Sequence, residues 1–181
     1  CDIVDIAGLV KGASQGEGLG NQFLGNIRET DAIIHVLRCF DNDNIVHVDG
    51  SVNPVRDKEI IDAELQLKDL ETVENRIKRV EKQARVGGDK QAKLEFDVLS
   101  AYRDALLQGK SARTVTFDTE DEIAAAKGLF LLTTKPVLYV CNVDDTSAAN
   151  GNPYVEAVRE AIKDEDAELL IISAQTEADI A

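Results

Sequence analysis

The sequence predicts an α/β fold, in which a helical hairpin interrupts a doubly wound, mainly parallel sheet. Two observations lead to this prediction. Mostly apolar, β-favouring runs at 32–40, 137–141 and 169–172 have the pattern of covered parallel strands, and a helical pattern at 152–163 separates the last two. Between the first two runs, apolar residues recur at near-heptad spacing on both sides of a glycine pair, which indicates two packed helices.

The other elements follow from shorter signals. Residues 3–5 are apolar up to an Asp and are expected to form a buried strand. A glycine-rich loop runs to residue 20, and residues 21–29 have a helical pattern. Thr119 and Glu122 have the spacing of a capping box, which predicts a short helix that ends near residue 128.

These elements divide the chain into three expected parts. Residues 1–56 and 109–181 form the two parts of the α/β domain, and residues 57–108 form the inserted antiparallel helical hairpin. Gly87-Gly88 is expected at the turn of the hairpin.

Composition narrows the class of protein. Hydrophobic content of 44% and charged content of 30% are typical of a globular protein. No apolar run approaches the roughly 18–20 residues that cross a bilayer, so no membrane partner is expected. The net charge of −14 argues against a broad nucleic-acid-coating surface, and no DNA partner is expected. Three widely separated cysteines lack metal-ligand spacing and fit a reducing cytoplasm. The chain begins at Cys1 and contains no Met, which predicts an internal piece of a longer protein.

The first motif is Asp5-x-x-Gly8, at the end of the expected first strand. A carboxylate in this place can hold Mg²⁺ through a water molecule, and a glycine N–H can meet the last phosphate of a nucleotide because no Cβ blocks the approach. A strand-to-loop turn with a solvated Asp is the alternative interpretation.

The second and third motifs also end predicted strands. Asn142-Val143-x-Asp145 follows one, where a carboxamide and a carboxylate can read a purine base, and Ser173-Ala174 closes the last. GTPases have Asn-Lys-x-Asp at the first of these places, so Val143 replaces the Lys that packs on guanine. An Asx-rich turn with solvated acids is the alternative.

The motifs occur in the order in which P-loop NTPases have them. The run DIAGLVKGASQGEGLGNQFLGNIRETDAIIHVLRCF, together with DNDNIVHV and Asn152-Pro153-Tyr154, resembles the YchF or Obg-like ATPase family. The resemblance implies an incomplete P-loop NTPase G domain with a coiled-coil insertion, lacking its phosphate loop and C-terminal TGS domain. Gly109-Lys110-Ser111 is not that loop, because a helical pattern rather than a strand precedes it.

The resemblance implies a cytoplasmic, ribosome-associated regulatory ATPase that prefers ATP to GTP and uses Mg²⁺, and a monovalent cation is left open as a further cofactor. The resemblance also implies that Asp5 contacts the metal through water and that Gly8 senses the γ-phosphate. Asn142, Val143, Asp145, Ser173 and Ala174 form the base site. The chain alone is expected to be inactive, because it has no phosphate loop. Two alternatives remain: a GTP-specific GTPase, and an RNA- or ribosome-binding module with incidental turnover.

Two further predictions concern catalysis and RNA. Leu9 stands where Ras-like enzymes have the Gln that orients the attacking water, so His47 is a candidate for that role, with a structural loop histidine as the alternative. Residues 75–93 carry seven basic side chains against two acidic ones around the expected turn. This stretch is either a solvated face or an RNA contact. The candidate RNA contacts are Arg76, Arg79, Lys82 and Arg85.

Overall fold

The computed structural model describes residues 1–5, 20–42, 50–86 and 88–180. The chain forms two compact units. The sheet unit consists of Ala32–Ile60 and Pro136–Ala181, and the helical unit consists of Cys1–Asp31 and Ile61–Lys135. Helix α2 (Pro54–Val86) begins in the sheet unit and continues in the helical unit. Within the described part of the chain, no helix has both the length and the apolar character needed to span a membrane.

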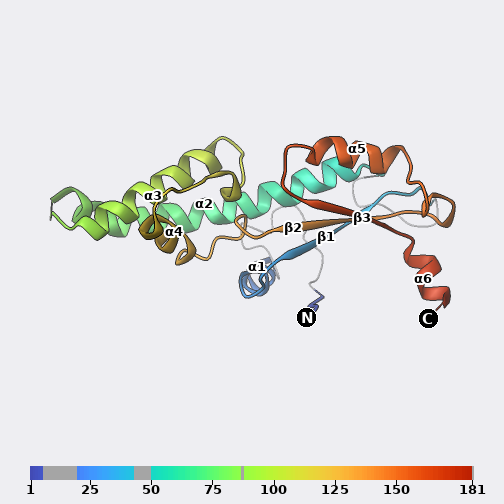
Figure 1. The fold of residues 1–181 in the computed structure, drawn as a ribbon, viewed down its shortest axis with the longest axis horizontal. Coiled ribbons are helices and arrows are strands. Elements are labelled where there is room, and N and C mark those ends of the chain that lie inside the picture. Colours follow the sequence, from blue (N-terminus) through green and yellow to red (C-terminus); the bar gives the residue numbers. More distant parts are fainter. Residues whose placement is uncertain (6–19, 43–49, 87, 181) are drawn as a thin grey trace. The chain divides into compact units, whose positions relative to one another are not determined.

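The sheet unit contains three strands in the order β1-β2-β3 (Figure 1). Both pairs of neighbouring strands are parallel, as the sequence predicts. They are β1 (Ile33–Arg38), β2 (Val137–Asn142) and β3 (Glu168–Ile172). Arg38 pairs with Asn142, and Asn142 pairs with Ile172. The carboxyl ends of all three strands therefore meet at one edge of the sheet.

Helix α5 (Pro153–Ile162) connects β2 to β3 and covers one face of the sheet. It begins where expected, because Asn152 caps it by accepting a hydrogen bond from Val155 N and proline occupies its first turn. Its apolar face packs on side chains of β1 and β2, and each fully buried valine contributes about 1.5–3 kcal/mol. The buried cluster consists of Leu37, Cys39, Tyr139, Cys141, Val143, Val155, Val158 and Ile162. The described part of the sheet unit also contains two short elements, η3 (Asp145–Ser147) and α6 (Ala174–Ile180).

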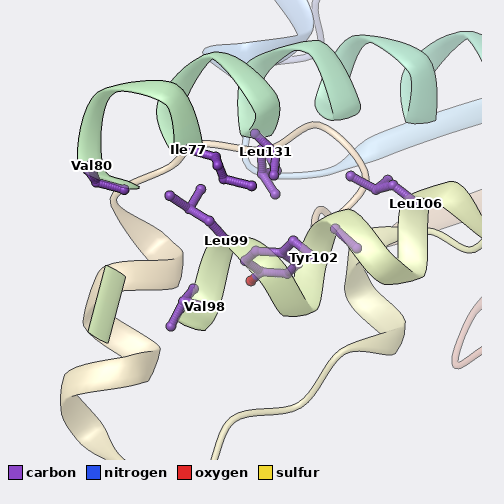
Figure 2. Close-up of a cluster of buried hydrophobic side chains, with 9 residues drawn as sticks. Ile77, Val80, Val98, Leu99, Tyr102, Leu106 and Leu131 are labelled. Carbon is purple, nitrogen blue, oxygen red and sulfur yellow. The ribbon is translucent and has the colours of Figure 1, made fainter. Parts of the chain in front are cut away.

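The helical unit is built around the hairpin of α2 and α3 (Lys90–Leu107), with α1 (Gly20–Arg28), η2 (Ala112–Thr114) and α4 (Glu120–Lys127). Figure 2 shows apolar side chains of α2 and α3 pointing toward one another, with Leu131 between the helices. The apolar residues with heptad-like spacing therefore form the interface between α2 and α3. Its buried members are Val73, Ile77, Val80, Val98, Leu99, Tyr102, Leu106, Ala112 and Leu131.

Capping residues determine where α2, α3 and α4 begin. The capping box of Thr119 and Glu122 is formed and begins α4, as predicted. Asp89 caps α3 by accepting hydrogen bonds from Gln91 N and Ala92 N. Helix α2 begins at Pro54 rather than at residue 57, because Asn53 Oδ1 accepts a hydrogen bond from Arg56 N at 3.0 Å.

The prediction of a buried strand at residues 3–5 is wrong. These residues have no strand assignment, and the side chains of Ile3 and Val4 are 79% and 59% exposed. A strand needs a neighbour that pairs with its N–H and C=O groups. In the part of the chain that the structure describes, only β1, β2 and β3 pair with one another, so residues 3–5 have no such neighbour.

Candidate functional site

Polar side chains gather at the carboxyl edge of the sheet, where β2 and β3 end side by side. Asn142 is the last residue of β2, and Ser173 follows the last residue of β3. Val143 N donates to Ile172 O at 2.8 Å, which extends the strand pairing by one residue and brings the two following loops together. The parallel register thus places the second and third sequence motifs at one location.

Asp145 is held at this edge by two hydroxyl groups. Its Oδ1 accepts one hydrogen bond from Ser173 Oγ and one from Thr176 Oγ1, each at 2.5 Å. These bonds stabilise the charged carboxylate, so they lower the pKa of Asp145 below its ordinary value, with Ser173 the larger cause. Asp145 is exposed to solvent, and among the described residues its Oδ2 has no hydrogen-bond partner.

Asn142 is joined to the loop that follows β3. Its Oδ1 accepts a hydrogen bond from Ala174 N at 3.0 Å, which leaves the two Nδ2 protons without a hydrogen-bond partner in the described chain. The edge therefore presents one amide donor from Asn142 and one carboxylate oxygen from Asp145. Such a pair can bind a group that carries an acceptor next to a donor.

The two residues between Asn142 and Asp145 have structural contacts of their own. Val143 is 3% exposed and belongs to the buried cluster under α5, so its side chain packs in the core of the sheet unit. Asp144 accepts a hydrogen bond from Ser147 N at 3.0 Å, which caps η3. That hydrogen-bonding lowers the pKa of Asp144.

A second set of contacts fixes the end of β1 to the start of α5. Asn152 Nδ2 donates to Cys39 O at 2.7 Å, while its Oδ1 caps the helix. Tyr154 OH donates to Asp41 Oδ1 at 2.7 Å, and this bond raises the pKa of Tyr154. In the sequence, Asn152 and Tyr154 stand out only as family signatures, and no local signal shows that their side chains join two elements.

Thr176 is a further site residue that sequence reasoning missed. It lies one helical turn after Ser173, in the first turn of α6. The available signal was this spacing of three residues between two hydroxyl side chains that follow a strand.

Three residues are predicted to act at the metal ion and the phosphates, and the structure describes only one of them, Asp5. Asp5 is exposed and lies outside any helix or strand. Gly8 and His47, the other predicted residues, lie outside the described residues. In the described ranges, no group of three or more His, Cys, Asp or Glu side chains is placed to hold a metal ion.

The basic stretch lies at the end of the hairpin, around the turn between α2 and α3. All of its basic side chains are exposed. Arg76 is paired with Glu95, and Arg85 is paired with Glu81 at 2.7 Å. Arg79 and Lys82 have no ion pair with any described residue. The four candidate RNA contacts thus divide into two paired and two unpaired cations.

Comparison with known proteins identifies the family. Residues 1–86 match a family model described as "50S ribosome-binding GTPase". The chain is 52% identical to the ribosome-binding ATPase YchF of Escherichia coli O157:H7, over 99% of this chain and 49% of that protein. It is 50% identical to the protein of the same name from Bacillus subtilis, with the same coverage. This chain belongs to the YchF family.

A solved YchF structure supports the fold as well as the sequence match. The solved structure of the Schizosaccharomyces pombe YchF GTPase aligns with a TM-score of 0.79 and 32% identity, covering 94% of this chain and 47% of that one. Coverage of this extent includes both the strands and the hairpin. The chain spans about half the length of the curated YchF relatives that it matches.

Proposed function

We propose that the protein containing this chain is a ribosome-associated nucleoside-triphosphate hydrolase that prefers ATP to GTP. The observation that supports this most directly is the convergence of Asn142, Asp145 and Ser173-Ala174 at one sheet edge. Ligands of open α/β sheets bind at the carboxyl ends of the strands. The YchF relatives from Escherichia coli and Bacillus subtilis are named ribosome-binding ATPases, which supports the proposal.

The base would bind through the two groups that remain unengaged. Adenine carries an acceptor, N7, next to a donor, the N6 amino group. Asn142 Nδ2 would donate to the acceptor, and Asp145 Oδ2 would accept from the amino group. Guanine carries two acceptors on that same edge, N7 and O6, so the carboxylate oxygen would face an oxygen there.

The phosphates would bind on the other side of the nucleotide. P-loop NTPases generally use Mg²⁺ with the nucleotide, and the metal neutralises charge on the β- and γ-phosphates. In this proposal Asp5 contacts the metal only through water, Gly8 N–H meets the γ-phosphate, and His47 helps to place the attacking water. A monovalent cation near the phosphates remains part of the hypothesis.

The hairpin would supply the ribosome contact, with ribosomal RNA as the partner of its basic end. Arg79 and Lys82 support this proposal, because they are exposed and have no ion-pair partner in the described chain. The functional division we propose is a G domain formed by 1–56 and 109–181 and a hairpin formed by 57–108. Association with ribosomes would place the protein in the cytoplasm.

Binding and turnover by the intact protein test the proposal. Titration with fluorescent ATP and GTP analogues should show tighter ATP binding, and turnover should be measured with and without ribosomes. GTP binding tenfold tighter than ATP, a difference of about 1.4 kcal/mol, would favour the GTP-specific alternative. Ribosome binding without any nucleotide turnover would instead support a binding module.

A further inference from the structure

The carboxylate of Asp145 is held asymmetrically. Both of its hydroxyl partners, Ser173 Oγ and Thr176 Oγ1, contact the same oxygen, Oδ1, at 2.5 Å. The two hydroxyl oxygens lie 3.1 Å apart, so Asp145, Ser173 and Thr176 form a closed triangle. A carboxylate bound in this way has a fixed orientation and offers one oxygen to a ligand.

The triangle is anchored on both sides. Ser173 is 3% exposed, and its Oγ also lies 3.4 Å from Thr176 N, in hydrogen-bond contact. Thr176 belongs to the first turn of α6, so its hydroxyl is positioned by the helix backbone. Turning Asp145 so that both of its oxygens face a ligand would break its two hydrogen bonds to Ser173 and Thr176. Hydrogen bonds to a charged group are stronger than those between neutral groups, so this rotation is disfavoured.

Recognition of guanine requires the opposite arrangement. The N1–H and N2–H₂ groups of guanine are two adjacent donors, and a carboxylate satisfies them best with both oxygens. The Ala174 N–H, a second group that could meet the base, is also engaged, because it donates to Asn142 Oδ1 at 3.0 Å. The N6 amino group of adenine needs only one acceptor, and Asp145 Oδ2 can still provide it.

We propose that Thr176 determines the base preference of this site by holding Asp145 Oδ1, so that the carboxylate reads one donor of adenine and not the two donors of guanine. This inference rests on the proposed nucleotide-binding function of the same edge. Thr176 is a positioning residue in this role, since it acts on the base only through Asp145.

The test uses two substitutions in the intact protein. Thr176→Val removes the hydroxyl and keeps the shape, whereas Thr176→Ser keeps the hydroxyl. Thr72→Val is the matched control, because Thr72 lies on α2 in the helical unit and its hydroxyl donates to Lys68 O. Dissociation constants for N-methylanthraniloyl-ATP and N-methylanthraniloyl-GTP are measured for each protein. Carbon-13 NMR follows the titration of the Asp145 carboxyl group.

Thr176→Val should shift the ratio of GTP to ATP affinity about tenfold toward GTP, and it should raise the pKa of Asp145. Thr176→Ser and Thr72→Val should leave the ratio within about twofold of the wild type. An unchanged ratio with intact ATP binding, or an equal loss of both affinities, would overturn the role of Thr176 alone. A wild-type protein that binds neither analogue would overturn the proposed function and this inference together.

Discussion

Asp69 Oδ2 accepts hydrogen bonds from both the backbone N and the hydroxyl Oγ1 of Thr133, each at 2.7 Å. The other oxygen of Asp69 accepts a bond from Leu132 N, also at 2.7 Å. Asp69 lies on α2 and is fully buried. One helix side chain therefore satisfies the backbone of the segment that follows α4, and it holds that segment on the hairpin.

Replacing Asp69 by Asn should destabilise the protein by about 1–3 kcal/mol. The amide group can still accept one of the backbone bonds, but its NH₂ would face another N–H and leave a buried donor unpaired. Urea unfolding of the intact protein measures the loss. Asp97→Asn on the exposed face of α3 is the control and should stay within about 0.5 kcal/mol of the wild type. Equal stability of both variants would mean that the buried bonds contribute little.

The same residue gives a pH dependence with a defined sign. Burial raises the pKa of Asp69 above its ordinary value, although its hydrogen bonds to Thr133 and Leu132 oppose the shift. The folded protein then binds this proton at a higher pH than the unfolded chain does. The contribution of Asp69 to stability is therefore largest at acid pH and decreases as the pH rises through the raised pKa. The stability difference between wild type and Asp69→Asn should grow on acidification, and a difference that shrinks would contradict this sign.

Replacing Asn152 by Ala should destabilise the sheet unit by about 1–3 kcal/mol, because it removes both the cap of α5 and the bond to Cys39 O. Asn150→Ala is the matched control, since Asn150 is exposed and two residues away. The free energy of unfolding is measured by urea titration. A control variant as unstable as Asn152→Ala would show that the loss is not specific to the cap.

Regular elements were predictable because their signals are local. The strands and α5 follow from apolar pattern and from Pro153, and the α4 cap follows from the Thr119 and Glu122 spacing. The expected strand at residues 3–5 failed because a strand depends on a neighbour, which a local apolar pattern does not reveal.

The same limit applies to the candidate site. Asn142, Asp145 and Ser173 were named from motif order, and the parallel register explains why they meet. Thr176 was missed because its bond to Asp145 spans 31 residues and depends on the direction of α6. Asp69 was missed for the same physical reason, since its partner Thr133 is 64 residues away.

The role of His47 stays a prediction, and kinetics can decide it. If His47 places the attacking water, His47→Ala in the intact protein should lower kcat about 10²–10⁴-fold and change KM much less. Nucleotide affinity, measured with the fluorescent analogues, should stay near that of the wild type. A change in kcat of less than about threefold would favour the alternative, in which His47 has only a structural role.

The end of the hairpin should bind ribosomal RNA mainly through Arg79 and Lys82, which form no ion pair with a described residue. Reversing Arg79 and Lys82 to Glu should weaken ribosome binding, because no described carboxylate already neutralises their charge. Reversing Arg76 and Arg85, which are paired with Glu95 and Glu81, should weaken it less. Binding measured at several salt concentrations should also show a flatter salt dependence for the Arg79 and Lys82 variant, by about 0.7–0.9 in log–log slope for each phosphate that the variant no longer neutralises.

The control for this experiment reverses the same number of charges elsewhere in the helical unit. Lys110 and Lys127 are exposed and lie outside the basic stretch, after α3 and at the end of α4. Their double reversal to Glu changes net charge equally and should leave the salt slope unchanged. If the Lys110 and Lys127 variant loses as much ribosome affinity as the Arg79 and Lys82 variant, the attraction depends on net charge. The end of the hairpin would then be only a solvated face. Loss confined to the Arg79 and Lys82 variant, with turnover in the absence of ribosomes unaltered, would separate RNA binding from nucleotide chemistry.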